Sequence, residues 1–99
     1  MAKVRAYVYQ DAALIFRVYP PVVVLQEGDK FELVNTVDKD CTWDVPAGPF
    51  GQRVAEKVAK KSVSPAKVAN AGPLAAEYEV KVNGIKAVAH SDPVIIIDP

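Results

Sequence analysis

The sequence is poor in the residues that most often carry chemistry. Its 99 residues include a single cysteine, Cys41, and a single histidine, His90. One cysteine excludes an internal disulfide, so the stability of the fold must come from packing. One thiol and one imidazole also fall short of the usual catalytic and metal-binding constellations. We therefore expect a protein that is not an enzyme and that holds no resident cofactor.

The sequence also lacks an excess of charge and any long apolar run. Lys and Arg number 12, as do Asp and Glu, and the formal net charge is zero. This balance argues against nucleic acid or an anionic membrane surface as the main partner, since both require a basic patch. No run approaches the roughly 20 apolar residues of a transmembrane helix. The N-terminal residues lack the apolar core of a signal peptide. The expected location is cytoplasmic if the chain is complete, and extracytoplasmic if a leader has been removed.

The stretch from residue 20 to residue 35 organises the expected fold. Residues 22–25, three β-branched valines followed by Leu25, suit a half-buried strand. Phe31 and Leu33 alternate with charged residues, which is the period of a strand with one dry face. Gly28 lies between the two segments and can adopt the positive φ of a tight turn. We predict two strands joined by this turn, with Phe31 and Leu33 in the core facing the preceding strand.

The rest of the chain reads as short strands within one domain, residues 1–99. We expect these further strands at 4–9, 14–19, 41–45, 76–82, 85–89 and 94–98. Asn83-Gly84 is the strongest local signal, because this pair is typical of a two-residue type I′ hairpin turn. Residues 52–61 differ, since Val54, Ala55, Val58 and Ala59 follow helical spacing. The sequence thus predicts a mainly β sandwich with one short helix at 52–61.

A family resemblance supports the sandwich. Eight residues follow the pattern Pro-x-x-Ile-x-Val-x-x-Gly-Asp-x-Val-x-Trp-x-Asn in register: Pro20, Val23, Leu25, Gly28, Asp29, Phe31, Leu33 and Asn35. The strand containing Tyr78, Val80 and Val82 is similar to the aromatic-x-Tyr-x-Cys strand of the same family. The chain resembles the cupredoxins, the blue-copper proteins related to plastocyanin. The resemblance implies a cupredoxin-like sandwich of antiparallel or mixed sheets, and an immunoglobulin-like sandwich is the alternative.

The copper ligands of that family do not carry over. The family's copper-binding cysteine aligns with Val82, which has no lone pair to donate. The region of its first histidine holds Cys41, and His90 lies near the place of the axial methionine. A blue-copper centre needs two imidazoles and a thiolate, which one histidine cannot supply. The resemblance therefore implies the fold and argues against the family's chemistry. We expect apolar side chains to close this end of the sandwich, with Cys41 packed nearby and His90 at the rim.

Two readings of the remaining candidates stay open. Cys41 is either a structural core residue or, with His90, part of a remodelled metal or electron-transfer site. The aromatic residues Trp43, Tyr7, Tyr9 and Tyr19 are either an interaction surface or ordinary core and cross-strand packing. The leading hypothesis is a metal-free binding or structural module for a protein partner or a second copy of the chain.

Overall fold

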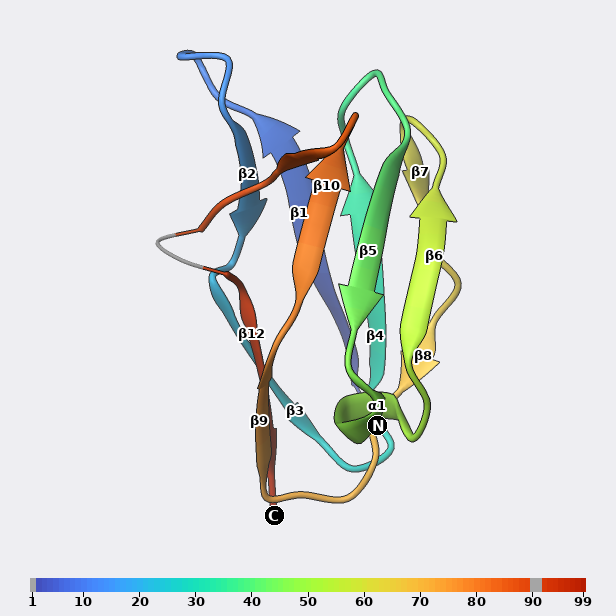
Figure 1. Ribbon diagram of the computed structural model, residues 1–99. Coiled ribbons are helices and arrows are strands. Elements are labelled where there is room, and N and C mark those ends of the chain that lie inside the picture. The colour runs from blue at the N-terminus through green and yellow to red at the C-terminus, as the bar shows by residue number, and fades with distance from the viewer. Residues whose placement is uncertain (1, 90–91) are drawn as a thin grey trace.

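Alternating apolar and polar residues fold the chain into a two-layered β-sandwich (Figure 1). The computed structural model describes residues 2–89 and 92–99. In chain order, the elements are β1 (Lys3–Gln10), β2 (Phe16–Tyr19), β3 (Val22–Gln26), β4 (Lys30–Asn35), β5 (Cys41–Val45), α1 (Ala47–Phe50), β6 (Val54–Val58), β7 (Ser62–Val63), β8 (Lys67–Val68), β9 (Leu74–Glu77), β10 (Glu79–Val82), β11 (Ile85–Lys86) and β12 (Val94–Asp98). No helix among the described residues is long and apolar enough to span a membrane.

The first layer is one sheet in the order β2-β1-β4-β7, with β8 also paired to β4. β1 is antiparallel to β2 and parallel to β4. Its pleat turns Ala6 and Val8 inward, where both are fully buried, and β4 buries Phe31 and Leu33 from the same side. The alternation of inward and outward side chains along β1 and β4 gives the sheet one dry face, and Glu32 on the outer side is also buried.

The second layer consists of two smaller sheets, β11-β10-β5-β6 and β3-β12-β9. β9 and β10 are separated only by Tyr78, so one stretch of chain passes from one sheet into the other (Figure 1). β12 lies in the middle of its sheet, parallel to β3 and antiparallel to β9. All three sheets send alternate residues into a single core.

An aromatic cluster occupies the middle of that core. The ring of Phe31 lies 5.9 Å from Trp43, 6.0 Å from Phe50 and 6.2 Å from Tyr78, measured between centroids. Such offset and edge-on arrangements are the favoured geometries of aromatic pairs. The cluster ties β4 of the first layer to β5 and to the chain around Tyr78 in the second.

Several predictions from the sequence are confirmed. Phe31 and Leu33 are fully buried in the cluster that also contains Val23 and Leu25. The Asn83-Gly84 pair forms the two-residue tip of the β10–β11 hairpin: both residues have positive φ (51° and 77°), and the flanking residues are directly paired. The fold is mainly β, as expected.

The predicted helix over 52–61 is wrong. Residues Val54–Val58 form strand β6, paired antiparallel with β5, and the short helix lies earlier, at Ala47–Phe50. Val54 and Val58 are four residues apart, a spacing that places them on one side of a helix and equally on one side of a strand. Pairing with β5 and the β preference of valine decide between the two.

Smaller differences concern strand boundaries. The expected strand over 85–89 is regular only at Ile85–Lys86, which is β11. β2 begins at Phe16 rather than at residue 14, because the turn after β1 continues through Leu14, which has a φ of 64°. The expected strand over 76–82 is divided at Tyr78 into β9 and β10. Residues 62–68, where the sequence predicts no strand, contribute the two-residue strands β7 and β8 to the edge of the first layer.

Candidate functional site

The end of the sandwich that corresponds to the family's copper site is closed by core residues. Cys41 on β5 lies directly opposite Val82 on β10, and their exposed fractions are 1% and 0%. Burial, with a smaller effect from the charge of Asp40, raises the pKa of the Cys41 thiol to about 11. Because the thiolate is the form that ligates metals and attacks electrophiles, Cys41 is held in its inert form at neutral pH.

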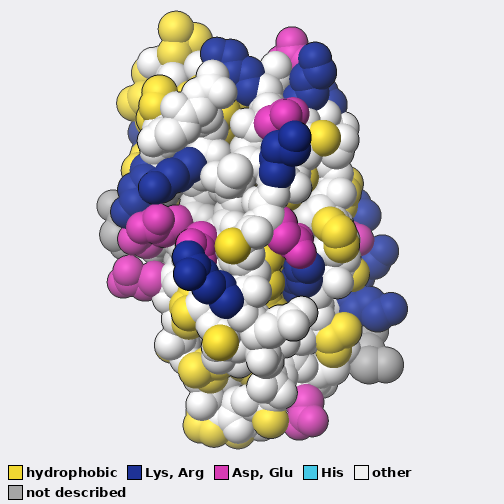
Figure 2. Space-filling model, turned by 45° about the vertical axis from the view of Figure 1, so that its right-hand side comes forward, with side chains coloured by type: hydrophobic (Ala, Val, Ile, Leu, Met, Phe, Trp, Pro, Cys, Tyr) yellow, Lys and Arg dark blue, Asp and Glu magenta, His cyan; other side chains and the backbone are white. Residues whose placement is uncertain are grey.

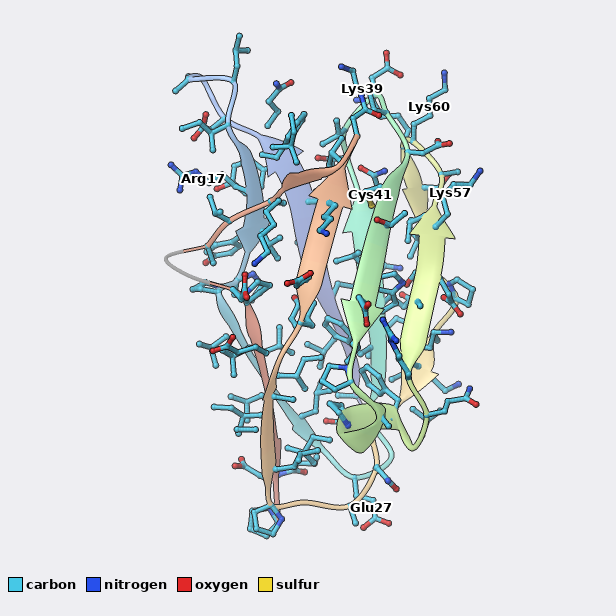
Figure 3. The ribbon with its side chains drawn as sticks, in the orientation of Figure 1. Arg17, Glu27, Lys39, Cys41, Lys57 and Lys60 are labelled. Carbon is cyan, nitrogen blue, oxygen red and sulfur yellow. The ribbon has the colours of Figure 1, made fainter. Side chains whose placement is uncertain are left out.

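Asn35, the last residue of the family-like pattern, fixes the loop at this end. Its side-chain nitrogen donates to the carbonyl oxygens of Lys39 (2.9 Å) and Val58 (3.2 Å), and its oxygen accepts from the Val37 amide (3.0 Å). Val37 is buried as a result and joins the core. Figure 3 shows Cys41 among the strands, whereas Lys39, Lys57 and Lys60 project outward around the same end.

The residues present do not fit a blue-copper centre. Val82 supplies volume and no ligand, and the chain has a single imidazole. The prediction that His90 stands at the rim falls outside the described residues. Within residues 2–89 and 92–99, no group of three or more His, Cys, Asp or Glu side chains could hold a metal ion.

The pairing of β1 with β2 brings the three predicted tyrosines together on the outer side of the first layer. Tyr7 lies opposite Tyr19, and Tyr9 lies opposite Arg17. The exposed fractions of Tyr7, Tyr9 and Tyr19 are 40%, 37% and 62%. On its other side, Tyr7 lies opposite Val34 on β4, so Tyr19, Tyr7 and Val34 form a row across three strands. We call the outer surface of β1, β2, β4, β7 and β8 the tyrosine face.

A groove of about 290 Å³ opens beside these tyrosines. It is lined by Tyr9, Arg17, Val18, Tyr19, Pro21, Val88 and Ala89. The Arg17 guanidinium is held in place, since its Nε donates to Asp11 Oδ2 (3.0 Å) and one of its terminal nitrogens donates to the Ala89 carbonyl (3.5 Å). Hydrogen bonds from the Ile15 amide and from Arg17 lower the pKa of Asp11, so this anchor stays ionised at neutral pH. The groove therefore combines aromatic walls with a positioned cation.

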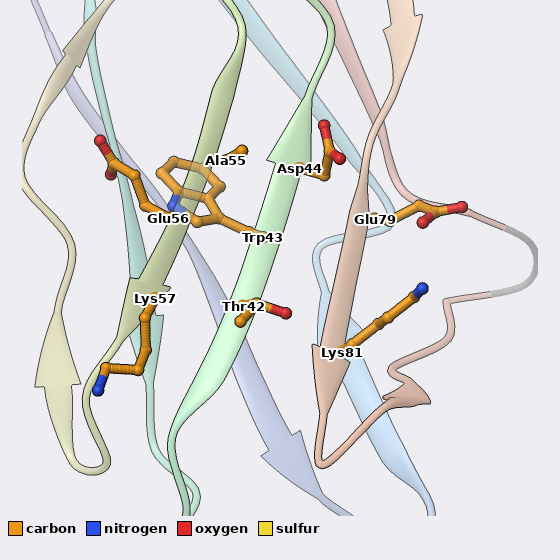
Figure 4. A pocket seen from close by; sticks show the side chains of 8 residues that line it. All are labelled: Thr42, Trp43, Asp44, Ala55, Glu56, Lys57, Glu79 and Lys81. Carbon is orange, nitrogen blue, oxygen red and sulfur yellow. The ribbon is translucent and has the colours of Figure 1, made fainter.

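Trp43 does not lie on the predicted surface. It is 1% exposed, its ring packs against Phe31, and its indole Nε1 has no hydrogen-bond partner among the described residues. The alternation along β5 indicates this burial. Trp43 shares the inner side of the strand with Cys41 and Val45, whereas Thr42 and Asp44 point outward. Figure 4 shows its indole and the Glu56 side chain on one side of the sheet, with Thr42 and Asp44 on the other.

A second groove, of about 320 Å³, runs over the outer side of β5, β6 and β10. Its lining is Thr42, Trp43, Asp44, Ala55, Glu56, Lys57, Glu79 and Lys81. Acidic and basic side chains are intermixed on the side of the molecule turned forward in Figure 2. In this region, ion pairs join Arg53 to Asp44, Lys57 to Asp40 and Lys86 to Glu79. Such mutually neutralised charges are typical of a solvated surface.

The layers, their register and the residues at this end define a β-sandwich of the cupredoxin type. Among solved structures, the chain is similar to the reduced Cu(I) form of an amicyanin variant, with a TM-score of 0.64 and 9% identity over 97% of this chain and 82% of that one. It is also similar to auracyanin B, with a TM-score of 0.61 and 10% identity over 99% of this chain and 89% of that one.

A third similar structure is the copper nitrite reductase of Nitrosomonas europaea, with a TM-score of 0.62 and 17% identity. The match covers all of this chain and 42% of that one. No protein-family model and no curated protein matches the sequence. At these identities the likeness concerns the fold, and the chain has the cupredoxin-like fold that its sequence predicts.

Proposed function

We propose that this chain is a metal-free cupredoxin-like domain that acts as a binding or structural module, without catalysis, and that the tyrosine face is its recognition surface. The observation that carries the proposal is the cross-strand set of three exposed tyrosines, Tyr7, Tyr9 and Tyr19, with the half-buried Arg17, which lies on one sheet beside a groove. In the region that corresponds to the family's copper site, by contrast, Cys41 and Val82 are buried.

Tyrosine suits this role for physical reasons. Its ring offers a large contact area with few rotatable bonds, so little side-chain entropy is lost on binding. Its hydroxyl keeps the face compatible with water when no partner is bound. Pairing within β1 and β2 fixes the spacing of the rings, which limits the cost of ordering them.

The proposal is tested by site-specific photo-crosslinking in cells that produce the protein. A photoreactive amino acid is placed at position 19 on the tyrosine face or, as a matched control, at position 42, an exposed position of the second layer. The expected result is a discrete crosslinked protein from position 19 that is absent from position 42. Equal crosslinking from both positions, or none from either, would overturn the assignment of the tyrosine face.

The alternative is a metal-binding or electron-transfer protein that uses Cys41 and His90. Tight binding to the native state must raise the melting temperature. We expect no rise in the melting temperature on adding Cu²⁺ or Zn²⁺, because the Cys41 thiol is buried and protonated. Calorimetric unfolding with and without each ion is the measurement. A rise of several degrees that disappears in His90→Ala would favour the alternative.

A further inference from the structure

The tyrosine face carries an excess of positive charge in a chain whose net charge is zero. Its outward positions and their immediate ion pairs include the cations Lys3, Arg5, Arg17 and Lys30 and the carboxylates Glu32 and Asp11. Glu32 Oε1 forms ion pairs with both Arg5 Nε (3.0 Å) and Lys3 Nζ (3.7 Å). These charges lie around an apolar row across four strands: Tyr19, Tyr7, Val34 and Val63.

A second apolar surface lies on the outer side of β3, β12 and β9. We call it the aliphatic face, and its outward positions are Val22, Val24, Gln26, Val94, Ile96, Asp98, Ala75 and Glu77. Val22 and Val24 are 45% and 52% exposed. The register forms a continuous row from Val24 through Ile96 to Ala75. Glu77 and Asp98 are the charged members of this set, and both are acidic.

The two faces point away from each other. β1 and β4 bury Ala6 and Leu33 in the same core into which β3 and β12 bury Leu25 and Ile95. Because each sheet presents its dry side to this shared core, the outer sides of the two layers lie on opposite sides of the molecule. The neutral chain is therefore polarised, with a basic apolar face on one side and an acidic apolar face on the other.

We propose that the occupant of the tyrosine face is a second copy of this chain, which contributes its aliphatic face. This inference rests on the proposed function, since it uses the same recognition surface and names its partner. Charge complementarity favours this pairing. The basic tyrosine face attracts the acidic aliphatic face of a second copy and repels the tyrosine face of that copy. The contact joins two different surfaces, so it is heterologous and continues from copy to copy as a chain or closes into a ring.

The geometry also sets the strength of the contact. The smaller aliphatic face limits the contact: its three strands are four or five residues long and, at about 4.8 Å apart, span a flat footprint of roughly 240 Å². This is well below the size of a standard specific interface, so the contact is weak. The association should consequently appear at high protein concentration and weaken as salt screens the opposite charges.

Two variants each block one face. Each places, at an exposed position, a charge that repels the opposing face. Tyr19→Glu puts an acid on the basic tyrosine face, and Val24→Lys puts a base on the acidic aliphatic face. Lys81→Glu alters an exposed residue of β10 outside both faces and is the matched control. Circular dichroism and melting curves confirm that each variant is folded before its mass is measured.

The test is sedimentation velocity of the wild type and variants up to about 1 mM, a range suited to a small interface. The wild type and Lys81→Glu should increase in mass with concentration, whereas Tyr19→Glu and Val24→Lys should each remain monomeric. An equimolar mixture of the two blocked variants should form dimers, because the aliphatic face of Tyr19→Glu and the tyrosine face of Val24→Lys are both unaltered. This mixture is the decisive measurement.

Other outcomes overturn the inference. A wild type that is monomeric throughout the range excludes the second copy as occupant. A blocked variant that still dimerises alone points to an isologous contact instead, and a mixture without dimers excludes pairing between the two faces. If the wild type is monomeric while position 19 crosslinks to a different protein, the proposed function stands and the self-association fails.

Discussion

Cys41 and Val82 face each other across β5 and β10, and both side chains are sealed in the core. In the pattern that the chain resembles, the Val82 position carries the copper-binding thiolate. Here the thiol lies on the neighbouring strand, where burial keeps it protonated. The chain thus has a cupredoxin-like fold in which the position of that thiolate is filled by a packed valine.

The buried thiol predicts a pH dependence of stability. The ordinary pKa of the thiol is 9.0, and the folded state raises it to about 11. Between these values the unfolded chain has lost the proton that the folded chain retains, so the free energy of unfolding should fall as the pH rises from about 9 to 11. Urea titrations across this range measure the slope. Cys41→Ala should reduce it, leaving the contribution of the buried Tyr78 phenol, whose pKa is also raised by burial. An unchanged slope would contradict the assignment to Cys41.

Leu33 tests the centre of the core. Its side chain is fully buried among residues of both layers. Leu33→Ala should lower the free energy of unfolding by about 2–5 kcal/mol, the usual cost of truncating a buried leucine. Ile85 is 58% exposed, and Ile85→Ala, the control, should stay within about 0.5 kcal/mol of the wild type. Equal losses from the two substitutions in chemical denaturation would show that burial does not govern them.

Lys67 and Glu56 join the two layers at the open edge of the sandwich. Lys67 on β8 donates from Nζ to Glu56 Oε2 on β6 (2.6 Å), and the lysine side chain is 16% exposed. Glu56 Oε1 is buried without a partner among the described residues. Losing Lys67 would leave this carboxylate unpaired, so Lys67→Ala should cost about 1–3 kcal/mol of stability.

A double-mutant cycle with Glu56→Ala checks this prediction. The loss caused by Lys67→Ala should shrink when Glu56 has already been removed. The exposed pair Lys57–Asp40, with 3.7 Å between its charged atoms, is the comparison, and Lys57→Ala should cost less than about 1 kcal/mol. Additive effects at the Lys67–Glu56 pair would show that the two side chains are not coupled.

Two glycines should differ sharply in their tolerance of alanine. A Cβ at Gly84 would enter open space, and only its positive φ opposes substitution, so Gly84→Ala should cost about 1 kcal/mol. A Cβ at Gly72 would collide with the backbone carbonyl oxygens of Ile97 and Asp98. Gly72→Ala should therefore displace β12 and cost more than Gly84→Ala in the same thermal unfolding assay. The reverse order would contradict the close approach at Gly72.

The sequence predicted burial and turns correctly where the local pattern of apolar residues is sufficient to determine them. Phe31, Leu33 and the Asn83-Gly84 turn were predictable because each depends on near neighbours in the chain. Val54 and Val58 fit a helix and a strand equally, so only their distant partner β5 separates the two. The same limit applies to Trp43, because the side of β5 on which it lies depends on the residue at which the strand begins.

The two faces illustrate what a single sequence cannot provide. Tyr7, Tyr9 and Tyr19 were recognisable as surface candidates by residue type, but their neighbours depend on the β1–β2 register. The aliphatic face escaped prediction altogether. Val24, Ile96 and Ala75 are spread over the chain, and each looks like an ordinary strand residue until β12 lies between β3 and β9.

The central place of β12 has a consequence for synthesis on the ribosome. β3 and β9 have no pairing with each other and meet only through residues 94–98. The valines of β3 are thus made some seventy residues before the strand that covers their hydrogen-bonding edge. Until that strand leaves the exit tunnel, the nascent chain exposes an apolar strand edge that can pair wrongly. A stalled chain that stops before residue 94 lacks this strand, so we expect it to expose the edge of β3 and to be a substrate for chaperones.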